Sequence, residues 1–406
     1  MIRFRNPGTL YSTHVYIIKQ LYARVGEKAY FTLKDMAVAI AQAKLMSAYG
    51  YSGDNAIKLS NTEQKSKNST LMNAKMYAEL FRMLGWITPY SESSSYPLVF
   101  TYIGLHIALS ENDCLKLYEQ SVLGICNPTQ FNDNMSYSEE TRFFKCALRT
   151  LIDLGGIMYK YELCLGPMNV SDNDEDAYQN MLRYIRSVRG DQRRLDTAFA
   201  ELADSLDMAI TSVDNTTRIP IGLMKSCGWI ETVKNSSLYG ESKTCIQITP
   251  HGRKVYESIK NMYDLRLGDY EKIDSYMQDA LIRIGVYSML ERAGYDISDV
   301  RKIIEYDRQV CSKLFGDKEL IFSPCAILHR SKVESALGVK FGIGNEDHAD
   351  LSMFQSTVKN REEIAATQVW DLNIPEGAAT ELLKTSEDID FLSRVNSLKE
   401  KGYSSS

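Results

Sequence analysis

The densest run of cationic side chains is a group of arginines near the middle of the chain. Five fall within twelve residues: Arg183, Arg186 and Arg189 at intervals of three, then Arg193 and Arg194. A spacing of three places side chains near one face of a helix, where guanidinium groups can run along a phosphate backbone. A solvated helix face, paired with the acidic residues just before it, explains the same pattern. Both interpretations stay open.

Metal-dependent phosphodiester cleavage is a second chemistry to consider. It needs an Asp and, on a neighbouring strand, Glu-x-Lys, because two carboxylates hold Mg²⁺ and the lysine activates water. Glu-x-Lys occurs at 63–65 and at 241–243, but the first leads into an expected helix and the second lies in an expected hairpin tip. Pro-Asp occurs nowhere. We therefore expect no catalytic residue, with a complete Mg²⁺-dependent endonuclease with a degenerate site as one alternative.

The remaining reactive residue types do not form known binding patterns. The five histidines include no HxH or HxxxH, and the eight cysteines no CxxC pair, so we expect no metal site. The glycine-rich stretch 338–345 lacks the Gly-Lys-Ser/Thr of a phosphate loop. We interpret Asp347, His348 and Asp350 as parts of a solvated loop. No cofactor is expected.

The elements that would position functional groups follow from an internal repeat. Residues 82–106 and 225–252 each contain Gly-Trp-Ile, a Ser-rich polar stretch and an apolar segment ending in Thr-x-x-Gly. Each copy follows apolar residues at helical spacing, so a helix is expected to end at Gly85 and at Gly228, where glycine can adopt a positive φ. Two strands joined by a hairpin come next. The threonine of each copy then caps a further helix.

The rest of the chain is mainly helical in pattern. Amphipathic periodicity predicts helices over 141–155, 175–189, about 192–210, 268–294, 296–315 and about 331–337. Residues 320–322 read as a short buried strand or turn. The expected fold class is therefore mainly α with small β-hairpins (α+β).

The pattern Leu-x-x-x-x-Gly-Trp-Ile, hairpin, Thr-x-x-Gly is similar to winged-helix DNA-binding domains, over roughly 28–110 and 138–260. Two such domains with helical regions resemble, by their arrangement, the DNA-recognition half of FokI and AlwI restriction endonucleases. The resemblance implies double-stranded DNA as a partner, with the helix before each hairpin in the major groove. Arg3 and Arg5 could form an arm that enters the minor groove.

In the first copy, the helix before the hairpin is expected to start near residue 66. Short polar and cationic side chains gather at its leading end, where a winged helix contacts DNA. These candidate contacts are Lys65, Lys67, Asn68, Ser69, Thr70, Asn73 and Lys75. An ordinary polar helix start explains the same residues.

In the second copy, the candidate contacts lie at the helix start, in the hairpin and in the arginine group. They are Asn215, Thr216, Thr217, Arg218, Lys234, Lys243, Arg186, Arg189 and Arg193. Arg218 is the expected base-reading residue, because a guanidinium can bond two guanine edge atoms at once. An ion pair with Asp214, four residues earlier, is the alternative role.

Charge and composition limit the class of protein. The 47 basic and 52 acidic residues give a formal net charge of −5, and residues 340–406 alone hold seven basic and twelve acidic residues. Any DNA-binding surface must therefore be a local patch. The sequence has no long apolar stretch that could span a membrane and no apolar signal segment at its start. We expect a cytoplasmic protein without membrane contact.

Four regions follow from these patterns. We expect a first winged-helix domain with an amino-terminal arm at 1–125, a second at 126–262, a helical region at 263–339 and an acidic tail or docking segment at 340–406. The expected function is DNA binding as the recognition subunit of a restriction or phage-defence system, with other protein subunits as partners. The other alternative is a structural adaptor whose winged helices dock proteins, in an ATPase or condensin-like assembly.

Overall fold

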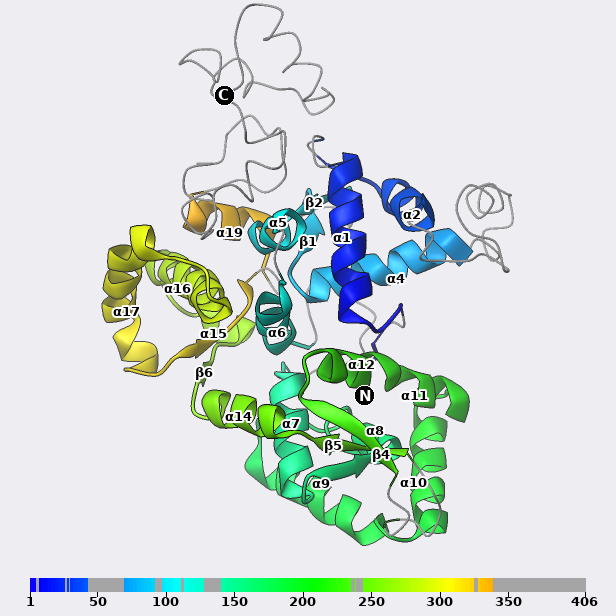
Figure 1. The fold of residues 1–406 in the computed structure, drawn as a ribbon. Helices are drawn as coiled ribbons and strands as arrows, with labels where there is room; N and C mark the ends of the chain where they lie inside the picture. Colours follow the sequence, from blue (N-terminus) through cyan, green and yellow to red (C-terminus); the bar gives the residue numbers. More distant parts are fainter. Residues whose placement is uncertain are drawn as a thin grey trace, which may run out of the picture.

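The structure is a computed structural model of the chain (Figure 1). It describes residues 1–338 apart from 5–6, 26–27, 29, 43–68, 92–96, 111–112, 128–139, 235–237, 239–243 and 325–327, and it does not describe the side chains of Gln42, Ser69 and Thr70. The described residues are mainly helical and include three small sheets, in agreement with the expected α+β class.

The elements around Trp86 are here called the first unit. In chain order they are α1 (Tyr11–Val25), α2 (Leu33–Gln42), α4 (Ser69–Met83), β1 (Ile87–Pro89), β2 (Leu98–Phe100) and α5 (Tyr102–Leu109). β1 and β2 pair antiparallel, with Ile87 opposite Phe100. Phe31, which lies between α1 and α2, forms a single antiparallel bridge with Leu98 of β2. β2 therefore pairs with Phe31 and with β1.

The elements around Trp229 are here called the second unit. They are α7 (Phe143–Asp153), β3 (Ile157–Tyr159), α8 (Lys160–Leu165), α9 (Glu175–Val188), α10 (Gln192–Ser205), α11 (Ile210–Thr216), α12 (Arg218–Ser226), β4 (Ile230–Lys234), β5 (Thr244–Ile248) and α14 (Pro250–Ile259). The sheet order is β3-β5-β4, all antiparallel. As in the first unit, the segment after the first helix pairs with the last strand, which pairs with the strand before it.

One helix of the second unit is shorter than its periodicity predicts. The helix expected over about 192–210 ends at Ser205, and α11 then begins at Ile210. Asp207 lies in the break with a φ of 50°, a left-handed conformation that interrupts a right-handed helix. The chain therefore reaches α12 through two separate helices, α10 and α11, and not through one long helix.

The repeated Gly-Trp-Ile segment has the same backbone hydrogen bonds in both units. Gly85 and Gly228 have φ values of 73° and 70°. The N–H of Trp86 and of Trp229 donates to the carbonyl five residues earlier, at 2.8 and 2.9 Å. The tryptophan carbonyl accepts the N–H of the following repeat threonine, at 3.0 and 2.9 Å. Both tryptophans thus connect a helix end to a hairpin, as the repeat predicts.

The Thr-x-x-Gly end of each repeat has two physical requirements. Thr101 and Thr249 cap the next helix, since each hydroxyl accepts the N–H of the glycine three residues later at 3.0 Å. That glycine lies against the tryptophan backbone. A Cβ on Gly104 would be 1.8 Å from the carbonyl oxygen of Trp86, and one on Gly252 would be 2.2 Å from that of Trp229. Only glycine fits at these two positions.

The third region is helical, as expected, with one parallel strand pair. It contains β6 (Tyr263–Asp264), α15 (Leu267–Tyr270), α16 (Ser275–Ala293), a 3-10 turn (Ser298–Val300), α17 (Arg301–Phe315), β7 (Leu320–Ile321) and α19 (Arg330–Leu337). Asp274 caps α16 by accepting the N–H of Met277, and Gly294, with a φ of 96°, ends it. The buried carboxylate of Asp307 ties α17 to Arg283 of α16, at 2.7 and 2.8 Å.

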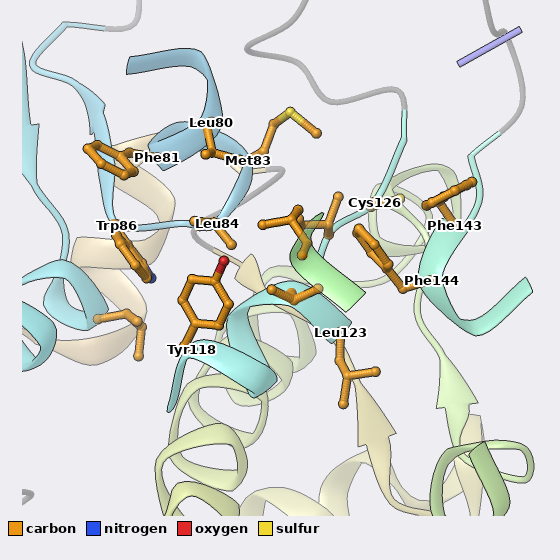
Figure 2. Close-up of a cluster of buried hydrophobic side chains, with 14 of the residues drawn as sticks. Leu80, Phe81, Met83, Leu84, Trp86, Tyr118, Leu123, Cys126, Phe143 and Phe144 are labelled. Carbon is orange, nitrogen blue, oxygen red and sulfur yellow. The ribbon is translucent and has the colours of Figure 1, made fainter. Parts of the chain in front are cut away.

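Helix α6 (Leu115–Leu123) lies between the two units and the helical region. Figure 2 shows Trp86 of the first unit beside Tyr118 of α6, while Phe143 and Phe144 at the start of α7 lie on the other side of the same buried cluster. The Trp86 and Tyr118 ring centroids are 5.8 Å apart. One continuous hydrophobic core therefore joins the described regions.

Candidate nucleic-acid interface

Arg218 is exposed at the amino end of α12, separated from α11 by Thr217 alone. Its expected alternative partner, Asp214, instead lies 2.7 Å from the ammonium of Lys160. Arg218 has no ion pair within the described parts of the chain. The guanidinium is therefore available for a ligand, and the alternative role as an ion-pair partner of Asp214 is wrong.

Two of the other predicted contacts at this helix start are not on the surface. Thr216 and Thr217 are buried, and their hydroxyls donate to the carbonyls of Val213 and Asp214 at 2.6 and 2.7 Å. These bonds close the last turn of α11, which explains why threonines follow it. Asn215 is exposed. The accessible groups at the start of α12 are thus Asn215 and Arg218.

The outer side of α12 and the first hairpin strand carry two further cations. Lys225 is exposed near the end of α12, with its ammonium 3.3 Å from the hydroxyl of Thr232 in β4. Lys234 is exposed at the end of β4, and Glu231 is exposed on the same strand. Lys243 lies outside the described residues. The described cationic surface of this unit near α12 is small, consisting of Arg218, Lys225 and Lys234.

In the first unit, the structure describes only part of the predicted leading end. Lys65, Lys67 and Asn68 lie outside the described residues, and Ser69 and Thr70 are described only as the first residues of α4. In that helix Asn73 is half-buried and Lys75 is exposed. Leu71 and Met72 are also exposed, by 39% and 51%. This helix start therefore mixes polar and apolar surface.

The carboxyl halves of α4 and α12 are covered by the chain's own amino-terminal segment, residues 8–11. The N–H of Gly8 donates to the hydroxyl of Tyr77 in α4 at 3.0 Å. The N–H of Tyr11 donates to the hydroxyl of Ser226 in α12 at 3.1 Å, and Thr9 packs against Gly222 of the same helix. At the amino end of α12 the described residues Asn215 and Arg218 are exposed, and in Figure 1 the amino ends of α4 and α12 both point to the right of the view.

The residues around Arg3 do not form the expected minor-groove arm, and Arg5 lies outside the described residues. Ile2 and Phe4 are buried, and the N–H of Ile2 donates to the carbonyl of Met168 at 2.7 Å. The Phe4 ring packs against Phe143, with centroids 5.2 Å apart. The reason is hydrophobic: Ile2 and Phe4, on either side of Arg3, pack into the core, which the charge pattern alone did not indicate.

Arg189 is a structural residue and not part of the surface. Its guanidinium lies 2.8 Å from the carboxylate of Glu162, which is fully buried, and it also donates to the carbonyls of Leu154 and Ile157. It therefore neutralises a buried charge and ties the end of α9 to β3. The prediction that Arg189 lies on a DNA-contacting face with its neighbours is wrong for this reason.

The other members of the arginine group are exposed. Arg183 and Arg186 lie on α9, where Arg186 donates to the carbonyl of Asp153 at 2.8 Å, and Arg193 and Arg194 start α10. Arg194 is 3.5 Å from the carboxylate of Asp191. Two acidic residues near the start of α9, Asp172 and Glu175, pair with Arg149. The exposed arginines of this group are thus largely uncompensated.

Acidic groups lie close to the leading end of α12. Burial raises the pKa of Tyr161, which stacks on Phe199, and the carboxylates of Asp214 and Asp196 raise it further. Glu201 and Asp204 are exposed on α10. These acids oppose phosphate along α10, so the cations of α12 and β4 are the groups near α12 that attract it.

The described residues also bear on the candidate catalytic and metal-binding groups. Both Glu-x-Lys motifs, at 63–65 and at 241–243, lie outside the described residues. Within the part of the chain that the structure describes, no three or more His, Cys, Asp or Glu side chains come together as a metal site. In the same part, no helix has the length and apolar character needed to cross a bilayer.

Comparison with known proteins adds no assignment. No protein-family model matches the chain, and no curated protein does so.

Proposed function

We propose that this chain is a DNA-binding component and that both units are winged helices. The observation that carries the proposal is the twofold occurrence of one framework: a helix ended by a positive-φ glycine, a hairpin begun by tryptophan and a threonine-capped helix. The matching strand order supports it, because a first strand that pairs with the last is the sheet order of a winged helix.

The contact is made by the amino ends of α4 and α12. Backbone N–H groups and the helix dipole favour phosphate at such ends. In the second unit, Arg218 enters the major groove and bonds a base edge, while Lys225 and Lys234 contact phosphates on either side. In the first unit, Lys75 and the polar residues before it supply phosphate contacts. Double-stranded DNA is the ligand.

The most specific version of the proposal is the recognition subunit of a restriction or phage-defence system. It rests on the resemblance of two joined winged helices, followed by a helical region, to the recognition half of FokI and AlwI endonucleases. Cleavage then comes from a separate subunit.

Binding to random-sequence duplex DNA at two salt concentrations, with and without Mg²⁺, tests the proposal. We expect affinity that falls steeply with salt, because phosphate contacts release counterions, and no cleavage with Mg²⁺. Selection from a random pool with the parent and with Arg218→Ala then tests base reading. The variant is expected to lose preference at one base pair, worth about 1–3 kcal/mol. The same selected site for both proteins contradicts that role.

A second candidate function is a structural adaptor that docks protein partners, as in an ATPase or condensin-like assembly. The exposed apolar side chains of Leu71 and Met72 at the open end of α4 favour it, because such groups suit protein contacts better than phosphate. Salt dependence separates the two candidates: the adaptor binds no duplex in the assay above.

A further inference from the structure

A cavity of about 100 Å³ lies between α6, α14, α16 and β7. Most of its lining side chains are apolar, among them Leu123, Met262, Met289 and Phe322. An apolar cavity of roughly 150 Å³ can hold benzene. The present cavity therefore has room for a molecule of a few heavy atoms.

Arg292 lines this cavity, and one of its guanidinium nitrogens has no hydrogen-bond partner among the described residues. Its Nε donates to Gln120 at 2.7 Å, and its Nη2 lies 3.4 Å from the carbonyl of Leu320. These two bonds hold the side chain in place. Its Nη1 is buried and makes no hydrogen bond to any described residue. The carboxylate of Glu319 is 3.8 Å from Nη1, beyond hydrogen-bond reach.

Glu319 forms an ion pair with another cation, Arg308. Arg308 donates to its carboxylate at 2.8 Å and to the hydroxyl of Ser288 at 2.9 Å. Burial lowers the pKa of Arg292, Glu319 raises it and Arg308 lowers it again. Arg292 and Arg308 thus both lie near Glu319, and the carboxylate of Glu291 also raises the pKa of Arg292.

The other charged lining residue, Glu119, already has partners. One of its carboxylate oxygens accepts the indole N–H of Trp229 at 2.5 Å and lies 2.7 Å from Nε2 of His251. Among the charged lining residues, Arg292 is therefore the one with a nitrogen that lacks a hydrogen-bond partner. The rest of the cavity surface is mainly hydrocarbon and thioether.

We propose that this cavity binds a small aliphatic carboxylate. The carboxylate group accepts a hydrogen bond from Nη1 of Arg292, and the hydrocarbon part lies against Met262 and Met289. A planar carboxylate is a good acceptor for a guanidinium. Inorganic phosphate is also an anion but has no hydrocarbon part, so it leaves the apolar wall uncovered. The site is independent of the DNA-binding proposal.

Ligand-observed NMR on the full chain, with butyrate as the probe, tests this site. We expect saturation transfer to butyrate, little transfer to n-butanol and no displacement of butyrate by an equal concentration of phosphate. Arg292→Lys, which moves the donor, and Met262→Phe, which fills the cavity, should each weaken butyrate binding at least tenfold. Arg301→Lys, an exposed arginine on α17 paired with Glu291, is the matched control and should bind as the parent does.

Several results overturn the proposal. They are no transfer to butyrate in the parent, equal binding of butanol, displacement by phosphate, or retained binding in either cavity variant. The ligand comparisons use the parent alone, so they decide the question even where a variant does not fold. Thermal unfolding of each variant shows which ones do.

Discussion

Trp86 and Trp229, the tryptophans of the two repeated units, donate their indole N–H groups to the same helix. Trp86 bonds to the hydroxyl of Ser121 at 3.0 Å and Trp229 to the carboxylate of Glu119 at 2.5 Å, two residues apart on α6. Both rings are fully buried. Helix α6 therefore binds the equivalent tryptophan of each unit. We infer that it fixes the position of α4 relative to α12.

Removing either acceptor should destabilise the protein. Ser121→Ala and Glu119→Ala each leave a buried indole N–H without its partner, at an expected cost of about 1–3 kcal/mol in the free energy of unfolding. Lys116→Ala, exposed on the same helix, should change it by less than about 0.5 kcal/mol. Urea unfolding followed by tryptophan fluorescence measures all three. Equal stabilities would show that α6 does not hold the units in this way.

The repeat glycines should not tolerate a methyl group. Alanine stabilises an ordinary helix over glycine by about 1 kcal/mol, but a Cβ on Gly104 or Gly252 would overlap the tryptophan carbonyl. We expect Gly104→Ala and Gly252→Ala each to destabilise the protein by about 1–3 kcal/mol. Gly268→Ala is the control, because its Cβ would be 3.8 Å from the nearest atom. Stabilisation by either repeat substitution would contradict the close approach. Thermal or urea unfolding gives the comparison.

Arg189 and Arg183 should behave differently although they lie in one run of arginines. Arg189→Ala leaves the buried carboxylate of Glu162 without its main cation, at a cost of about 3–5 kcal/mol, whereas Arg183→Ala removes an exposed side chain and should be nearly neutral. Chemical unfolding of both variants checks this. Similarly small changes in the free energy of unfolding for both variants would contradict the structural role of Arg189.

Two buried histidines make stability depend on pH. Burial lowers the pKa of His14 to about 4 and that of His106 to about 3. Between these values and the unfolded pKa of about 6.5, the unfolded chain binds more protons than the folded one. The free energy of unfolding should therefore fall as pH falls from about 6.5 toward 4, by up to roughly 1.4 kcal/mol per pH unit for each histidine.

A variant isolates this contribution. Urea unfolding of the parent and of His106→Phe at several pH values between 7 and 4.5 should give a shallower slope for the variant, because one of the two groups no longer titrates. Identical slopes would mean that His106 does not stay neutral in the folded protein.

The repeated framework could be predicted because its contacts are local. The positive-φ glycine, the tryptophan after it and the threonine cap bond to groups within a few residues or across one hairpin, so residue type and spacing indicate them. Most of the expected helices are present for the same reason, but two are interrupted: the one over about 192–210 breaks at Asp207, and the one over 268–294 is divided into α15 and α16. No glycine or proline marks either break.

The candidate site was predicted less well because its accessibility depends on distant contacts. Arg189 differs from Arg183 through its contacts with Glu162, Leu154 and Ile157, which lie 27 to 35 residues before it. Thr9 and Tyr11 cover α12 from more than 200 residues away. Contacts between residues so far apart produce no pattern that can be recognised in the sequence. The same is true of the bonds from Trp86 to Ser121 and from Trp229 to Glu119.

The salt dependence of DNA binding by a charge-removal variant tests the central claim most directly. The parent is compared with Arg218→Ala/Lys225→Ala/Lys234→Ala and with Lys302→Ala/Lys313→Ala/Lys318→Ala, a control that removes three exposed cations from the helical region. Each lost phosphate contact should flatten the slope of log affinity against log salt by about 0.9. We expect a slope shallower by roughly two to three units for the first variant and the parental slope for the control. Equal slopes for all three proteins, or no salt-dependent binding by the parent, would contradict DNA binding through the second unit.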